Sequence, residues 1–215
     1  MSTHHDHDHD HDHHDHAHPT RPDVDAPLTY HQKLEIAVRE LLVEKGIVTA
    51  DEVRRTVEAM DARSPAGGAR VVARAWTDPA YKQLLMADPA KALPQVGVEA
   101  GLYKLVVVEN TEKVHNLVVC TLCSCYPRAV LGLPPDWYKS RAYRSRAVRE
   151  PRKVMAEFGL EVPDDVAVRV HDSTADMRYL VLPKRPEGTE GWSEEKLAAI
   201  VTRDTMIGVA EARVS

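Results

Sequence analysis

The stretch VCTLCSCYPR (residues 119–128) contains all three cysteines of the 215-residue chain, Cys120, Cys123 and Cys125. An apolar run, LVVC (117–120), leads into it and predicts a strand that ends at the first cysteine. The C-x-x-C-x-C spacing then allows three sulfur atoms to converge in the loop that follows. Clustered cysteines cannot join distant segments, so the spacing favours metal or redox chemistry over a secreted disulfide framework.

Three interpretations of the spacing stay open from the residues alone. Structural zinc needs four thiolate or imidazole ligands, and His115 is a candidate for the fourth, although a role within the strand or turn is its alternative. A trivalent catalytic metal would take three thiolates and the backbone nitrogens of Ser124 and Cys125, leaving one octahedral position open. A redox pair is the third, because C-x-x-C motifs lower thiol pKa values.

Residues 28–100 predict a helical N-terminal arm. The segment 29–46 carries an apolar stripe at helical spacing and ends at Gly46, and TADE (49–52) has the spacing of a capping box. Asp78 and Asp88 each precede a proline, the pattern of an N-cap followed by the first helical residue.

Residues 101–215 predict an α+β domain that carries the cysteines. Apolar β-branched runs at 105–109 and 117–120 suggest two strands paired through a polar turn at 110–113. A cationic helix is expected from Pro135, with a break at Pro151 and a second helix that ends at Gly159. Strands are expected at 166–173 and 177–183, and a helix from about Ser193, where SEEK supplies a cap and an acidic first turn. The expected fold is a helical arm followed by a layered α/β-sheet domain.

The N-terminal segment, residues 1–27, is expected to be a disordered tail. Its first 18 residues contain nine of the twelve histidines and five aspartates. Such a tract can bind divalent metals, and an inert extension is the alternative.

The remaining chain has 28 acidic and 28 basic residues, which gives no support to nucleic-acid binding. Five arginines lie in the run Lys139–Arg152, where a solvated or interface helix is favoured over an anion site. No apolar run of about 18 residues and no leader pattern appear, so we expect no membrane partner and a cytoplasmic location.

The sequence also resembles a known family. VCTLCSC followed by YP, together with VLGLPPDWYK, YRSRAVREPR, RYLVLPKRPEGTEGW and TRDTMIGV, is similar to the α subunit of nitrile hydratase from about residue 30 onward. The resemblance implies hydration of nitriles to amides at one low-spin Co(III) or Fe(III). The implied metal ligands are the sulfurs of Cys120, Cys123 and Cys125 and the amide nitrogens of Ser124 and Cys125.

The resemblance implies further roles for these residues. Cys123 would be oxidised to sulfinic acid and Cys125 to sulfenic acid, and these two with Ser124 would form the catalytic group, while Cys120 would stay an unmodified thiolate. Cobalt members carry threonine after the first cysteine and iron members serine, so Thr121 points to one Co(III) per chain rather than Fe(III).

The family pattern also implies partners. Two arginines of a β subunit would bind the oxygenated cysteines, so the chain would be active only with that subunit, in a heterodimer or an α2β2 heterotetramer. The helical arm would wrap around the β subunit. A cobalt-insertion activator protein and a small nitrile substrate complete the expected partners.

Two positions depart from the family pattern. Most members carry tryptophan in the substrate pocket where this chain has Arg128, and many carry tryptophan where it has His171. The γ subunit of thiocyanate hydrolase shares the arginine and a His/Asp-rich N-terminus, so a thiocyanate hydrolase is the alternative; a non-catalytic zinc-binding protein is the other. Arg178 is expected to support the site or an interface.

Overall fold

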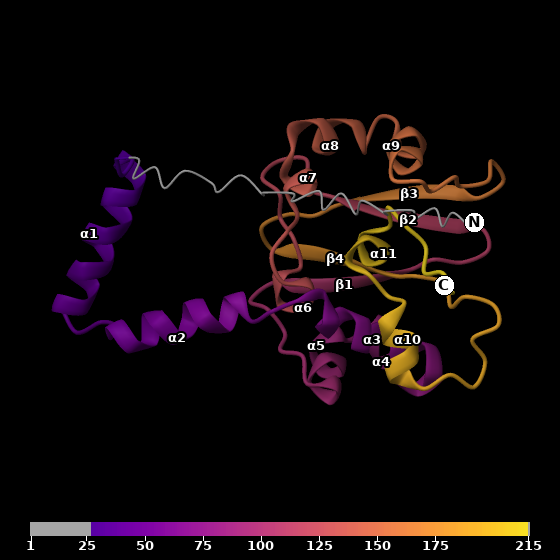
Figure 1. Ribbon diagram of the computed structural model, residues 1–215, viewed down its shortest axis with the longest axis horizontal. Helices are drawn as coiled ribbons and strands as arrows, with labels where there is room; N and C mark the ends of the chain where they lie inside the picture. The colour runs from indigo at the N-terminus through magenta and orange to yellow at the C-terminus, as the bar shows by residue number, and fades with distance from the viewer. Residues whose placement is uncertain (1–26, 215) are drawn as a thin grey trace, which may run out of the picture. The chain divides into compact units, whose positions relative to one another are not determined.

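The computed structural model of the protein describes residues 27–214 (Figure 1). The predicted tail, residues 1–27, lies outside the described residues except for its last position. The chain divides into two compact units, residues 1–50 and 51–215, which are treated separately below. None of the helices in the described part has the length and apolar character that a membrane span requires.

The first unit contains α1 (Tyr30–Glu44), as the sequence predicts. Thr29 caps it: its side chain accepts from the Gln32 amide at 3.3 Å, and the Gln32 side chain accepts from the Thr29 amide at 2.8 Å. These reciprocal bonds satisfy two amides that a helix start leaves without partners. The apolar stripe of α1 is about half exposed at Leu34, Val38 and Leu41, so the helix has an apolar face available to a partner.

The other elements follow in chain order. The helices are α2 (Ala50–Asp61), α3 (Pro65–Thr77), α4 (Pro79–Ala87), α5 (Pro89–Ala92), η1 (Leu93–Val96), α6 (Arg128–Leu131), α7 (Asp136–Lys139), α8 (Arg141–Arg146), α9 (Pro151–Glu157), α10 (Glu194–Ala199) and α11 (Arg203–Ile207). The strands are β1 (Lys104–Glu109), β2 (Val114–Val119), β3 (Ala167–Asp172) and β4 (Met177–Leu182). The predicted caps at Asp78, Asp88 and Ser193 are confirmed, since each side chain accepts from an amide of the helix that it precedes.

The predicted pairing of β1 with β2 is wrong. β1 pairs in parallel with β4, and β2 pairs in parallel with β3. The turn between β1 and β2 is held instead by Asn110, whose amide donates to Leu182 O at 2.9 Å and whose side chain accepts from the Asn116 amide at 2.8 Å. Nearly continuous apolar runs such as LVVV are typical of parallel strands, and the short connection obscured that signal.

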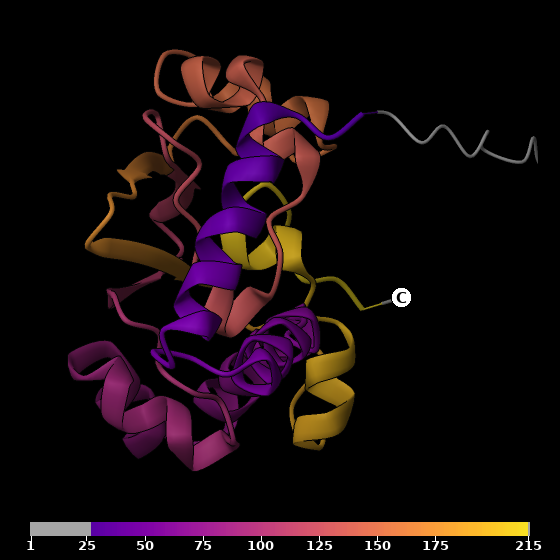
Figure 2. The same ribbon diagram turned by 90° about the vertical axis from the view of Figure 1, so that its left-hand side faces the viewer.

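The second unit has helices on both sides of its strands. α9 lies beside β3, and α4 and α5 lie beside β1, at opposite ends of the unit in both views (Figures 1 and 2). β2 contacts β4, which packs the two small sheets against each other, and α11 contacts both strands. α3 is buried along one face at Val71, Val72 and Ala75, in the same core as the strands. The observed α+β class agrees with the sequence prediction.

Parallel pairing of β2 with β3 decides where the cysteines lie. Val119, the last residue of β2, is in register with Asp172, the last residue of β3. Cys120 therefore emerges beside the Asp172 side chain, at the edge where both strands end. The carboxyl ends of parallel strands are a common location for ligand sites.

Gly208 ends α11 at a position that tolerates no side chain. Its φ is 92°, and a Cβ there would overlap the carbonyl oxygen of Asn116 in β2. We expect Gly208→Ala to lower the free energy of unfolding by about 2–4 kcal/mol, because left-handed strain adds to a backbone clash. Urea denaturation measures this. Gly188→Ala is the control, with φ of 74° and open space around it, and should cost about 1 kcal/mol; equal losses for both variants would contradict the predicted clash.

Candidate metal centre

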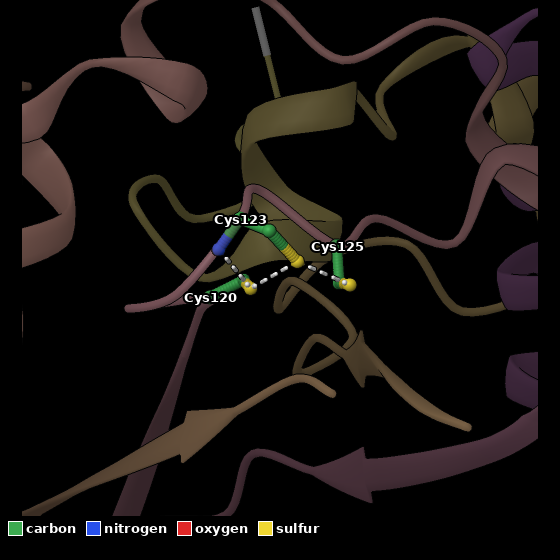
Figure 3. Close-up of side chains that lie close together, drawn as sticks. All are labelled: Cys120, Cys123 and Cys125. Atoms are coloured by element: carbon green, nitrogen blue, oxygen red, sulfur yellow. Dashed lines mark hydrogen bonds between the residues drawn. The ribbon is translucent and has the colours of Figure 1, made fainter. Parts of the chain in front are cut away.

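The three cysteine thiols converge in the loop that follows β2, residues 120–125, called here the cysteine loop (Figure 3). The Cys123 sulfur lies 3.7 Å from that of Cys120 and 3.0 Å from that of Cys125. All three sulfurs lie within 4.8 Å of one another, and none is in a disulfide. Cys120 is buried, Cys125 is half-buried and Cys123 is exposed, so the site opens to the surface on one side.

The backbone of Ser124 makes this convergence possible. Its φ is 69°, and among the described residues it alone combines a side chain with a positive φ. A left-handed residue reverses the chain direction, which brings the side chains of Cys123 and Cys125 to the same side. The Ser124 hydroxyl donates to the carbonyl oxygen of the preceding residue, Cys123. Its backbone conformation is therefore what this residue contributes to the loop.

Side chains from other elements fix the cysteine loop. Asp172 accepts from the Thr121 amide at 2.9 Å and from its hydroxyl at 2.6 Å. Arg144 donates to Leu122 O at 2.9 Å, and Tyr138 donates to Cys125 O at 2.8 Å. Sequence reasoning missed these three anchors. The available signal for Asp172 was the strand pairing that the prediction got wrong, and Arg144 lies in a run that was interpreted as a solvated or interface helix.

The environment makes the thiols unequal. Burial raises the pKa of Cys120, but the amides of Cys123, Cys125 and Leu122 point at its sulfur and together lower the pKa below the usual value. Burial, followed by the neighbouring thiol of Cys123, raises the pKa of Cys125 to about 12, although the charge of Arg178 opposes this. Cys120 is therefore the thiol whose anion the protein itself stabilises.

The donor set fits one soft metal ion. Two sulfurs that each lie about 2.3 Å from an ion are separated by about 3.2 Å at a right angle and about 3.8 Å at a tetrahedral angle. The observed separations of 3.0 and 3.7 Å are close to these values. Thiolate sulfur suits zinc and transition metals rather than magnesium or calcium. Among the histidine, cysteine and acidic side chains of the described part of the chain, these three cysteines form the group that is close enough to share one ion.

His115 lies apart from this group. Its Nε2 is 2.8 Å from Gly208 O, and its Nδ1 is 3.3 Å from the Asn110 side-chain nitrogen. Both ring nitrogens are thus engaged inside the fold, as expected for a strand residue and not for a fourth zinc ligand. His171 is similarly engaged, with Nε2 2.8 Å from Asn116 Oδ1, and burial lowers its pKa, with a smaller contribution from Arg169.

Arg128 is the first residue of α6, three positions after Cys125, and its side chain is exposed. No ion pair or side-chain hydrogen bond links it to another residue of the described range 27–214. Arg178 lies with its guanidinium carbon 5.0 Å from the centre of the Tyr103 ring, and its Nε is buried without a partner. The exposed guanidinium of Arg128, in contrast, is available to a ligand or a partner chain.

The basic run 139–152 is largely engaged in the fold. Arg146 pairs with Glu150 and Glu157, and Arg152 donates to three backbone carbonyls between residues 162 and 166. These contacts leave little of the run to form a continuous cationic surface.

Known proteins resemble this chain in sequence and in structure. The chain is 51% identical over 181 residues to the cobalt-containing nitrile hydratase subunit alpha of Pseudonocardia thermophila, covering 82% of this chain and 88% of that one. It is 48% identical over 189 residues to the thiocyanate hydrolase subunit gamma of Thiobacillus thioparus, covering 82% and 78%. A solved double mutant of the Fe-type nitrile hydratase from Comamonas testosteroni Ni1 superposes with a TM-score of 0.76 at 42% identity, covering 85% and 90%.

The family assignment rests on nearly the whole described chain. Residues 29–210 match the sequence model of "Nitrile hydratase, alpha chain", a range that includes α1, the cysteine loop and α11. The resemblance stated from the motifs is thereby confirmed. The converging thiols, the α+β fold and these matches agree, and the chain belongs to the nitrile hydratase alpha-chain family of enzyme subunits.

Proposed function

We propose that the protein is the α subunit of a cobalt-dependent nitrile hydratase, which hydrates nitriles to amides. The observation that carries this proposal is the convergence of three thiols within 4.8 Å at the end of β2, in a chain of this family. Thr121 supports cobalt over iron through the resemblance, and the similarity to a cobalt-containing subunit agrees.

The proposed metal ligands are the sulfurs of Cys120, Cys123 and Cys125 and the amide nitrogens of Ser124 and Cys125. When bound, Co(III) would supply Lewis-acid activation for the addition of water to a C≡N group. The chain itself presents the sulfurs in one place and keeps Cys120 apart from solvent. Burial shields the Cys120 sulfur from oxidation, whereas the exposed Cys123 and half-buried Cys125 are accessible to it, as the proposed sulfinic and sulfenic acids require.

The exposure of the cysteine loop supports a requirement for a β subunit. Leu122, at the tip of the loop, is 86% exposed. The open side of the site is therefore accessible to a partner chain. Two oxygenated cysteines would also need charge-assisted donors, while Arg144 is already directed at loop carbonyls. We infer that the β subunit supplies the missing donors, in a heterodimer or α2β2 assembly, and that an activator protein delivers the cobalt.

A thiocyanate hydrolase is the second candidate. The observation that favours it is Arg128, an exposed cation without a partner in the described range 27–214, three positions after the cysteine loop. Thiocyanate carries the same C≡N group as a nitrile and a negative charge, which a guanidinium binds well. The similarity to a thiocyanate hydrolase subunit gamma agrees with this alternative.

Metal and mass analysis of the complex purified with its β subunit tests the proposal. We expect one cobalt per chain, an added mass of three oxygen atoms on the peptide that contains the cysteine loop, and nitrile hydration that the isolated chain lacks. Iron in place of cobalt would correct the metal alone. One zinc with unmodified cysteines would reject the catalytic proposal and favour a zinc-binding protein. Relative turnover of a neutral nitrile and of thiocyanate separates the two enzymatic candidates.

A further inference from the structure

Arg144 in α8 reaches the cysteine loop from a helix that has no other part in the site. Its Nη1 lies 2.9 Å from Leu122 O and 3.5 Å from Thr121 O. Its Nε is buried without a hydrogen-bond partner, and it forms no ion pair within the described residues. The hydrogen-bond acceptors that the guanidinium has in this part of the chain are therefore the two loop carbonyls.

The geometry of one peptide bond connects Arg144 to a sulfur. In a trans peptide the C=O and the N–H lie in one plane and point in opposite directions. The carbonyl of Leu122 shares its peptide with the N–H of Cys123, and that N–H donates to the Cys120 sulfur at 3.3 Å. A positive charge on the oxygen side of a peptide polarises it and strengthens the N–H as a donor. Arg144 thus acts on Cys120 through the peptide between them.

We propose that Arg144 is a positioning residue for the metal centre: it fixes the peptide between Leu122 and Cys123 and strengthens the hydrogen bond from Cys123 N–H to the Cys120 sulfur. The inference rests on the proposed metal site. Asp172 holds the same loop differently, because it accepts from the amide and hydroxyl of Thr121. A sulfur that accepts a stronger hydrogen bond donates less charge to a metal, so Arg144 would tune the centre as well as shape it.

Variants of Arg144 in the complex with the β subunit test the inference. Arg144→Gln should release its metal into a chelator about 10- to 100-fold faster, the usual effect of losing an outer-shell partner. The sulfur-to-metal charge-transfer band should move to lower energy, since the Cys120 sulfur becomes a stronger donor. The release rate and the band energy of Arg144→Lys should lie between those of the wild type and of Arg144→Gln, because one ammonium group can replace one of the two contacts. Arg149→Gln is the matched control, because Arg149 donates from Nε to Ser145 O and does not contact the loop.

The outcomes separate this inference from the proposed function. A wild-type complex without cobalt or iron rejects the proposed function, and the inference falls with it. A loaded wild type with an unchanged band and release rate in Arg144→Gln rejects the inference alone. Faster release with an unmoved band would show simple support of the loop and would overturn the polarising role. Circular dichroism and the Tm of Arg144→Lys identify any loss of folding.

Discussion

Replacing Cys120 with serine is expected to abolish metal loading and to reduce nitrile hydration by more than about 100-fold, beyond the usual effect of an outer-shell change. The reason lies in the donor atom. Cys120 is buried, and three amides lower its pKa and favour the thiolate. A serine hydroxyl stays protonated at neutral pH and is a poor ligand for a soft metal, so a site that needs three sulfurs would keep two.

The control for this prediction is Ser124→Ala. Alanine keeps the backbone nitrogen that the proposed site uses and loses only the hydroxyl, which bonds to the adjacent Cys123 carbonyl. We expect this variant to retain its cobalt and to lose less than about tenfold in turnover, close to the value of one hydrogen bond. Metal content by elemental analysis and steady-state kinetics measure both variants. A Cys120→Ser complex with one cobalt and wild-type turnover would show that the metal is bound elsewhere.

Replacing Arg128 with tryptophan is expected to separate the two candidate substrates. A charge-assisted hydrogen bond contributes about 1.5–3 kcal/mol, so the kcat/KM for thiocyanate should fall by about 10- to 100-fold if Arg128 binds the anion. A neutral nitrile has no charge to lose, and an indole adds apolar surface. The kcat/KM for a neutral nitrile should therefore stay within about threefold, or rise because KM falls.

Two further variants make this test specific. Arg128→Lys keeps the positive charge and should retain most of any thiocyanate turnover. Arg141→Trp introduces the same indole on α8, at another exposed arginine, and should leave kcat/KM for both substrates unchanged. Equal losses for thiocyanate and nitrile in Arg128→Trp would show that the residue supports the fold or the subunit interface and does not select the substrate.

Local signals were sufficient for much of the architecture. The caps at Asp78, Asp88 and Ser193 lie where the sequence places them, because an N-cap depends on residues within one helical turn. The cysteine motif and the motifs around it together indicated the family, and the apolar runs and helix signals indicated the α+β class; both predictions are confirmed. These features share one property: each is encoded within a short window of residues.

Tertiary structure decided the features that depend on distant segments. Parallel pairing joins β2 to β3 across about fifty residues of sequence, and local apolar patterns do not specify a strand's partner. That pairing places Asp172 against Thr121, and the packing of α8 places Arg144 against Leu122. The sequence by itself determined which atoms are available to bind a metal; only the fold decided which side chains position them, because positioning depends on contacts between residues that are remote along the chain.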